Sequence, residues 1–183
     1  MNKNRFRRDK TIQLLADLFF FAVFLTIDQL TKYAAVLKLK DKQPYVLWEG
    51  VFEFHYLENR GAAFGMLQNR KVFFVFAAVL MMTVILFVLF KTPLSAKYRA
   101  WHMLLVPIAA GGIGNMIDRL RLNYVIDFFY FKLIDFPIFN VADIYVTVGV
   151  AFLIIFMLFM WKEEDLQFIS LHIQKNPKQS RKV

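Results

Sequence analysis

The chain has 183 residues, of which 58% are hydrophobic and 17% aromatic, and it carries a formal net charge of +9. A chain of this length has room for one domain, and its composition is too apolar for an ordinary soluble fold. It contains no cysteine, which excludes disulfide bonds, thiol catalysis and cysteine-ligated metals.

Four apolar stretches of about 20 residues, the length that spans a bilayer core, follow one another along the chain. They cover residues 12–36, 72–90, 101–120 and 141–161. Gln13, Asp17 and Asp28 interrupt the first stretch, so neighbouring helices must shelter them. The pattern predicts an all-α membrane protein with four transmembrane helices, forming one integral membrane domain over residues 1–183. A soluble bundle of buried helices is the alternative.

The N-terminus imitates a secretory signal peptide, because several basic residues precede an apolar run. However, the run is too long, no small-residue cleavage site follows it, and three more apolar stretches come after it. We therefore interpret it as an uncleaved first span.

Basic residues concentrate in three segments. These are Lys3, Arg5, Arg7, Arg8 and Lys10; Lys91, Lys97 and Arg99; and Lys162, Lys175, Lys178, Arg181 and Lys182. The positive-inside rule makes these segments, including the tail 162–183, cytoplasmic, and the connections 37–71 and 121–140 then face outward. No nucleic-acid-binding motif accompanies the charge, so we expect the basic tails to meet anionic membrane lipid and not nucleic acid.

The connection after the first span is rich in aromatic and β-branched residues over about 41–67, with Pro44 and Gly50 as breaks. It predicts a small outward-facing β-rich segment on the membrane surface, where Trp and Tyr are enriched.

The sequence lacks the residue patterns of most kinds of hydrolytic enzyme. The serines lie in polar segments predicted to be cytoplasmic, and none has a nucleophile-elbow context. His55, His102 and His172 form no zinc-protease motif, and we expect each to be an interfacial or surface residue. No metal and no cofactor is predicted.

Four carboxylates in or beside the apolar stretches remain: Asp28, Asp118, Asp127 and Asp143. A charge at membrane depth costs roughly 2.5–3.5 kcal/mol, so it is rarely present for structure alone. Asp127 and Asp143 flank a loop of the predicted outward side, before and at the start of the fourth span. Two neighbouring acids can share one proton, so that one activates water and the other polarises a carbonyl. The pair predicts an aspartic peptidase dyad.

Other polar residues are expected to support this pair. Asn115, Asp118 and Arg119 share a helix face, and we expect Arg119 to pair with Asp118. Asp28 and Lys32, four residues apart, are expected to form an ion pair. Asn140 could donate to a carboxylate or to the substrate backbone, and Asp17 is interpreted as structural.

Five sequence blocks point to a known family. They are Asp28-Gln29-Leu30-Thr31-Lys32, Asn59-x-Gly61-Ala62-Ala63-Phe64-Gly65, Gly111-Gly112-x-Gly114-Asn115-x-x-Asp118-Arg119, Val125-Ile126-Asp127-Phe128 and Phe136-Pro137-x-Phe139-Asn140-Val141-Ala142-Asp143. In this order they resemble the lipoprotein signal peptidase (signal peptidase II) family, from about residue 28 to 149.

The resemblance implies a four-span aspartic protease of the bacterial inner membrane, with both termini cytoplasmic and the active site near the outer face. Its substrate would be a lipidated prolipoprotein, cut just before a diacylglyceryl-modified cysteine, and we expect a monomer. The catalytic pair matches Asp127 and Asp143. Positions that match the substrate pocket are Asp28, Lys32, Asn59, Gly61, Asn115, Arg119 and Asn140. Asp118 matches a motif acid ranked below Asp127, and Ile144 departs from the small residue that commonly follows the last Asp.

Two alternatives stay open at this stage. A proton- or cation-coupled transporter could use the four acids as a relay, although four spans without an inverted repeat argue against it. A family member that only binds lipidated peptides is the other alternative.

Overall fold

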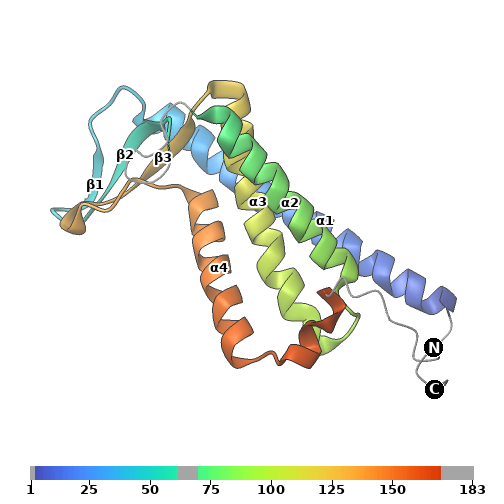
Figure 1. The fold of residues 1–183 in the computed structure, drawn as a ribbon. Coiled ribbons are helices and arrows are strands. Elements are labelled where there is room, and N and C mark those ends of the chain that lie inside the picture. Colours follow the sequence, from blue (N-terminus) through green and yellow to red (C-terminus); the bar gives the residue numbers. More distant parts are fainter. Residues whose placement is uncertain (1–2, 62–69, 170–183) are drawn as a thin grey trace, which may run out of the picture.

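The computed structural model describes residues 3–61 and 70–169, and four long helices dominate this part of the chain. They are α1 (Lys3–Leu39), α2 (Lys71–Lys91), α3 (Arg99–Leu122) and α4 (Val141–Phe159). Each is long and apolar enough to cross a membrane. A helix supplies hydrogen-bond partners for its own backbone, and this is required in a bilayer because hydrocarbon offers none. The prediction of a mostly helical membrane protein is confirmed (Figure 1).

The helix bounds differ from the predicted ranges at several ends. Helix α1 extends beyond 12–36 in both directions, and α4 ends at Phe159, before the predicted end at 161. A 3-10 helix over Ala96–Tyr98 precedes α3, and another over Glu163–Ile169 follows α4. Residues 170–183 of the predicted tail lie outside the described part of the chain.

Helix α3 occupies the centre of the bundle. Half of its hydrophobic window is buried, against 11–17% in the other three helices, whose apolar faces are left for lipid. Small residues allow neighbours to approach it closely. A Cβ at Gly111 would lie 2.5 Å from the Ala142 carbonyl oxygen on α4, and one at Gly114 would overlap the Asp28 carboxylate on α1.

A three-stranded antiparallel sheet has the order β1 (Tyr45–Trp48), β2 (Phe52–Asn59) and β3 (Val125–Phe131). The first two strands confirm the β-rich segment, while positions 62–67 of it lie outside the described residues. The third strand corrects the interpretation of 121–140 as a loop. Its run of branched and aromatic side chains pairs with β2, and Leu57 opposes Asp127 in the register. Strand pairing gives hydrogen-bond partners to the backbone N–H and C=O groups of this segment, which a loop would leave unpaired.

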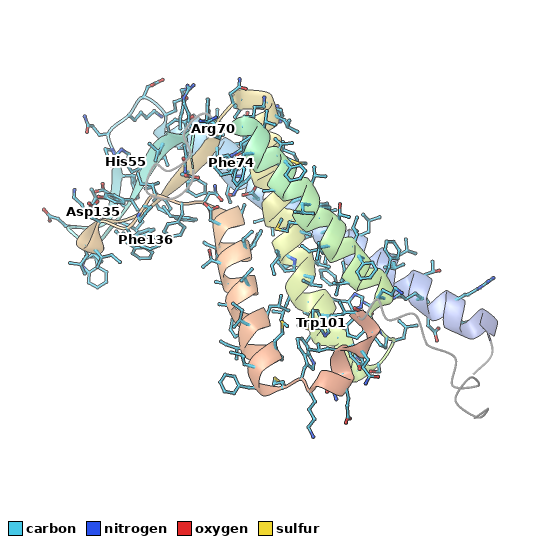
Figure 2. The ribbon with its side chains drawn as sticks, in the orientation of Figure 1. His55, Arg70, Phe74, Trp101, Asp135 and Phe136 are labelled. Atoms are coloured by element: carbon cyan, nitrogen blue, oxygen red, sulfur yellow. The ribbon has the colours of Figure 1, made fainter. Side chains whose placement is uncertain are left out.

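The sheet lies at one end of the bundle, beside the end of α1 and the start of α4 (Figure 1). Asp135 and Phe136 mark this end, whereas Trp101 lies at the opposite one (Figure 2). There Trp101 stacks on Trp161 with ring centroids 4.4 Å apart, which fixes the chain after α4 against the start of α3.

Candidate active site

Asp127 lies in β3 and is almost completely buried, at 1% exposure. Each of its carboxylate oxygens accepts one amide hydrogen bond. Asn140 Nδ2 donates to Oδ1 over 2.7 Å, and Asn59 Nδ2 donates to Oδ2 over 2.8 Å. The β2–β3 pairing brings Asn59 to this position, because it places the end of β2 opposite Val125.

Asp143 lies in the first turn of α4 and closes a capping box with Asn140. The Asn140 side-chain oxygen accepts from the Asp143 backbone N–H over 3.0 Å, and Asp143 Oδ2 accepts from the Asn140 backbone N–H over 3.1 Å. Such a box satisfies two helix-start donors, and the helix N-terminus favours a negative charge. Local structure thus fixes the Asp143 side chain.

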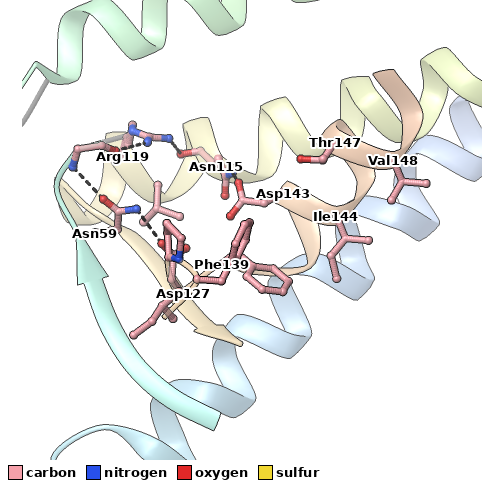
Figure 3. Close-up of a pocket in the computed structure, with 14 residues that line it drawn as sticks. Asn59, Asn115, Arg119, Asp127, Phe139, Asp143, Ile144, Thr147 and Val148 are labelled. Carbon is pink, nitrogen blue, oxygen red and sulfur yellow. Dashed lines mark hydrogen bonds between the residues drawn. The ribbon is translucent and has the colours of Figure 1, made fainter. Parts of the chain in front are cut away.

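Two asparagines, Asn115 and Asn140, join the two acids into one hydrogen-bonded chain, and Figure 3 shows both acids with Asn115. Asn115 Nδ2 donates to Asp143 Oδ1 over 2.8 Å, and Asn140 Nδ2 donates both to Asp127 and, over 3.1 Å, to Asn115 Oδ1. The acids predicted as a dyad are therefore brought to one site.

The orientation of all three side-chain amides is dictated by groups that can only donate. The Asn59 oxygen accepts from the Gly61 backbone N–H over 2.9 Å, and the Asn140 oxygen accepts from the Asp143 N–H. The Asn115 oxygen accepts from the Lys32 ammonium over 2.7 Å. With each oxygen held in this way, each NH₂ group is left to face a carboxylate of Asp127 or Asp143.

Both acids border a cavity of about 440 Å³. Its polar lining comes from Asn59, Gly61, Asn115, Arg119, Asp127, Asp143 and Thr147, and its apolar lining from Val125, Phe136, Pro137, Ile138, Phe139, Ile144 and Val148. Ile144, the departure noted in the sequence, is thus part of the cavity wall (Figure 3). Within the described ranges, no three His, Cys, Asp or Glu side chains are placed to hold a metal ion.

Burial raises the pKa of Asp127 to about 7, and the nearby charge of Asp143 adds to this rise. The hydrogen bonds from Asn59 and Asn140 oppose it, because they favour the ionised carboxylate. Asp127 therefore titrates near neutrality, far above the ordinary range of an aspartate.

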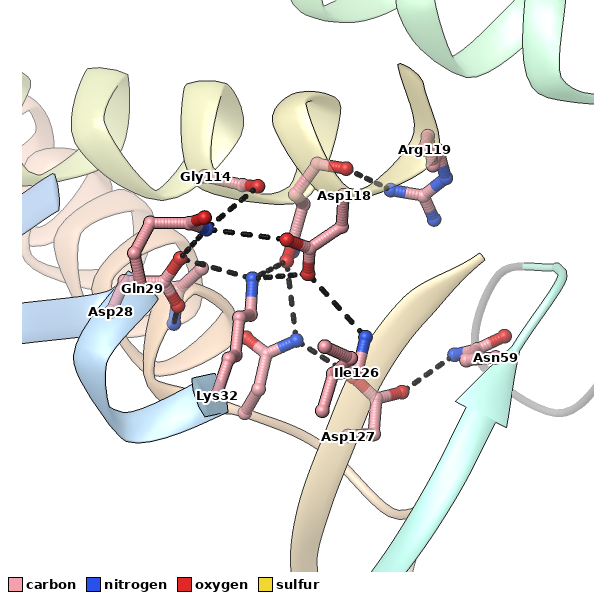
Figure 4. Close-up of polar contacts among 12 residues, drawn as sticks. Asp28, Gln29, Lys32, Asn59, Gly114, Asp118, Arg119, Ile126 and Asp127 are labelled. Carbon is pink, nitrogen blue, oxygen red and sulfur yellow. Dashed lines mark hydrogen bonds and ion pairs between the residues drawn. The ribbon is translucent and has the colours of Figure 1, made fainter. Parts of the chain in front are cut away.

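A second buried cluster lies behind the dyad, centred on Lys32 (Figure 4). Its ammonium lies 3.0 Å from Asp28 Oδ2 and 3.0 Å from Asp118 Oδ2, and all three side chains are nearly inaccessible. Gln29 Nε2 donates to the same two acids, over 3.1 Å and 3.2 Å. The expected pair of Asp28 and Lys32 is present, and it is part of a larger network.

This cluster also binds the two elements that carry the dyad. Asp28 Oδ1 accepts from the backbone N–H of Ala142 over 3.1 Å, and Asp118 Oδ2 accepts from the backbone N–H of Ile126 over 3.4 Å. Ala142 directly precedes Asp143, and Ile126 directly precedes Asp127. The Lys32 cluster thus fixes the backbone at both catalytic candidates.

The expected pair of Arg119 with Asp118 is wrong. Asp118 faces Lys32, while the Arg119 guanidinium donates to the Gly61 carbonyl over 3.0 Å and lies 4.3 Å from the Phe74 ring centroid. Adjacent residues on a helix point about 100° apart, so the two side chains lie in different environments. Positions 62–65 of the second sequence block lie outside the described residues.

His102 is likewise not a surface residue. It is buried and its Nδ1 lies 2.7 Å from Asp17 Oδ2, at the end of the bundle away from the sheet. Gln13 also donates to Asp17 over 3.0 Å. No local sequence pattern predicts the contact of His102 with Asp17, because the two residues are 85 positions apart.

The sequence reasoning missed several contributors to the site. The capping box could have been found from the spacing of Asn140 and Asp143 before an apolar run. Gln29 lies inside the first sequence block, whereas the cavity wall residues Thr147 and Val148 carry no distinguishing local signal. Fold and site together define a multi-pass membrane protein with an acid pair, Asp127 buried and Asp143 half-buried, beneath a small sheet at one end of its helical bundle.

Two solved structures described as bacterial membrane enzymes, determined by the in meso method at 2.3 and 1.9 Å resolution, share this fold. The first has a TM-score of 0.70 and 27% identity, covering 78% of this chain and 87% of the other. The second has a TM-score of 0.68 at 27% identity, covering 80% and 94%.

The family model for signal peptidase II matches residues 20–159. The lipoprotein signal peptidase of Streptococcus thermophilus (strain CNRZ 1066) is 47% identical over 140 residues, or 76% of this chain and 88% of that protein. That of Streptococcus pyogenes serotype M5 (strain Manfredo) is 43% identical over 146 residues, or 78% and 91%. The chain belongs to the signal peptidase II family. Membership supports a membrane protease and disfavours the transporter alternative.

Proposed function

We propose that the protein is an aspartic endopeptidase that removes signal peptides from diacylglyceryl-modified bacterial prolipoproteins. The observation that carries this proposal is the placement of Asp127 and Asp143 on one cavity, joined by Asn115 and Asn140. The named relatives are lipoprotein signal peptidases, and the dyad positions fall inside the matched range.

In this mechanism Asp127 is the acid and Asp143 the base. The raised pKa of Asp127 leaves about half of the molecules with a proton on it at pH 7, and Asp143 accepts hydrogen bonds from the Asn140 backbone N–H and from Asn115, which suit a base. Asp143 takes a proton from water while the water oxygen attacks the scissile carbonyl carbon. Asp127 gives its proton to the carbonyl oxygen, which produces a neutral gem-diol.

Collapse of the gem-diol completes the reaction. Asp143 passes its proton to the leaving nitrogen as the C–N bond breaks, and a gem-diol hydroxyl returns a proton to Asp127. The carbonyl of the signal-peptide fragment is thereby left as a carboxylic acid, and the dyad regains its starting protonation. Asn59 and Asn140 hold Asp127 throughout.

The surroundings of the dyad suit an apolar, lipidated substrate. The main cavity has an apolar wall that includes Phe136 and Ile138, and a second cavity of about 250 Å³ is lined by Phe74 and Met81 on α2. Asp143 borders both cavities, so peptide and acyl groups can lie on either side of the reacting bond. One chain supplies both acids, which supports action as a monomer.

Charge distribution supports a topology with both termini in the cytoplasm and the dyad near the outer face. The start of α1, the α2–α3 connection and the 3-10 helix after α4 lie at the end opposite the sheet (Figure 1). The basic residues of segments 3–10 and 91–99 belong to this end. The positive-inside rule then favours an orientation in which the sheet lies on the outer side of the bacterial inner membrane.

The test is cleavage of a diacylglyceryl prolipoprotein by protein purified in detergent and lipid, followed by a gel shift. Asp127→Asn and Asp143→Asn should each lower turnover by about 100- to 10,000-fold, the usual contribution of an acid or base. Asp135→Asn is the matched control, because Asp135 is exposed in a left-handed conformation that Asn accepts. Full turnover in both dyad variants would refute the mechanism, and an inactive wild type would favour the binding-only alternative.

A further inference from the structure

A cavity of about 790 Å³, different from the two that Asp143 borders, lies at the sheet end of the molecule, between the last turns of α1 and the sheet. It shares no lining residue with the dyad cavity. Asp127 lines the dyad cavity, whereas the next two residues of β3, Phe128 and Phe129, line the other cavity. Strand β3 therefore separates the two cavities.

The interior of this cavity is apolar. Its walls include Ala34 and Ala35 on α1, Phe54 on β2 and Phe128 on β3. The volume lies within the range of small-molecule sites, and the walls offer van der Waals contact and few polar partners. Such a space fits hydrocarbon better than it fits water.

The charge of the lining is one-sided. Lys38 and Lys42 are its only charged members, both are exposed, and neither forms an ion pair with a residue of the described ranges. Lys40 between them differs, since its ammonium lies 3.0 Å from Glu58. The Lys42 ammonium also donates to the Leu37 carbonyl over 3.3 Å, which covers the negative end of the α1 dipole with positive charge.

The depth of the cavity in the membrane follows from α1. Lys38 lies in the last turn of this membrane-spanning helix, and the exposed Tyr45 follows on the first strand. Lysines at a helix end and tyrosines beside them are typical of the level of lipid headgroups. An apolar space with two ammonium groups at this level complements a phosphate with an acyl chain attached.

We infer that this cavity binds one anionic phospholipid, with its phosphate at Lys38 and Lys42 and an acyl chain against Phe54 and Phe128. The bound lipid would support β3 from the face opposite to Asp127. This inference does not depend on the proposed peptidase mechanism, because binding is measured without turnover.

The test uses full-length protein in phosphatidylcholine nanodiscs that contain phosphatidylglycerol with a photoreactive acyl chain. Labelled peptides are located by mass spectrometry. We expect labelling concentrated within residues 31–45 and at 128–129, and weaker labelling there by a matched photoreactive phosphatidylcholine. Lys38→Gln/Lys42→Gln should lower phosphatidylglycerol labelling of this site about 25-fold, since each lysine near a phosphate surface contributes roughly a factor of five.

Two controls separate the site from general lipid contact. Arg121→Gln/Lys132→Gln removes two positive charges outside the cavity and should leave the labelling unchanged. Ala34→Trp fills the cavity without changing charge and should lower labelling by both lipids. Even labelling along all apolar helix faces, or unchanged labelling of the Lys38/Lys42 variant, would overturn the inference. Equal labelling by a photoreactive diacylglycerol would do so too, because it would identify a neutral occupant.

Discussion

The Lys32 ammonium donates to the side-chain oxygen of Asn115 over 2.7 Å. This contact connects the buried ionic cluster to the dyad, since it leaves the NH₂ group of Asn115 free to donate to Asp143 over 2.8 Å. Lys32 contacts neither Asp127 nor Asp143, but it determines that the NH₂ group of Asn115, and not its oxygen, faces Asp143. Lys32 is a positioning residue in this arrangement.

Replacing Lys32 by Met should therefore destabilise the protein and lower its turnover. It leaves Asp28 and Asp118 buried without a counter-charge, which costs about 3–5 kcal/mol when a buried pair is broken. Thermal unfolding and cleavage are the measurements. Lys40→Met is the matched control, because Lys40 and Glu58 are also 3.0 Å apart but partly exposed, so its effect on stability should be much smaller. Equal shifts in the two variants would contradict the assigned role.

Asn140 combines two roles that substitution can separate. Serine caps a helix nearly as well as asparagine but has no NH₂ group for Asp127 and Asn115. Asn140→Ser should keep most of the stability and lose turnover, whereas Asn140→Ala should lose turnover and about 1 kcal/mol of stability as well. Melting temperature and kcat of both variants test this. Wild-type kcat in the serine variant would show that the amide bridge has no part in the reaction.

The pH dependence of cleavage should follow Asp127. Its pKa of about 7 means that the proposed acid loses its proton as pH rises through about 7, so kcat/KM should fall there. The same raised pKa makes the folded state bind this proton more tightly than the unfolded chain. Its contribution to stability is therefore complete below the ordinary pKa of aspartate and is lost as pH rises through about 7.

Removing the Asn59 amide should move this alkaline limb. The hydrogen bond from Asn59 lowers the pKa of Asp127, so Asn59→Ala should raise that pKa and shift the fall in kcat/KM to higher pH. A pH profile of cleavage for wild type and variant measures the shift. A limb that stays in place would assign it to a group other than Asp127.

Two adjacent glycines should respond differently to the same substitution. A Cβ at Gly111 would lie 2.5 Å from the Ala142 backbone oxygen, whereas one at Gly112 would meet the flexible end of Met81. Gly111→Ala should push α4 from α3 and cost about 1–3 kcal/mol together with turnover, because Asp143 follows Ala142. Gly112→Ala should be tolerated. Thermal unfolding and cleavage compare the pair, and similar behaviour of both variants would argue against close α3–α4 packing as the cause.

Much of the architecture could be predicted from the sequence because the bilayer imposes a simple rule. Apolar stretches of spanning length must be helical in a bilayer. The four expected helices are present, and α2, for example, covers the predicted stretch 72–90. The dyad itself could be proposed by elimination, since Asp127 and Asp143 are expensive in apolar surroundings and other chemistry is poorly supplied. The strand character of Val125–Phe131 was missed, because an aromatic run beside a span also fits an interfacial loop.

By itself, the sequence determined the four membrane helices and the first two strands and pointed to the candidate acids, because hydrophobic length, strand composition and residue type are local properties. Only the tertiary structure decided that Asp118 pairs with Lys32 and not with Arg119, and that three asparagines turn their NH₂ groups toward the dyad. These choices depend on which donor faces each oxygen across elements far apart in the chain. Such long-range hydrogen bonds leave no periodic pattern in the sequence, so the packing of α1, α3, β3 and α4 had to reveal them.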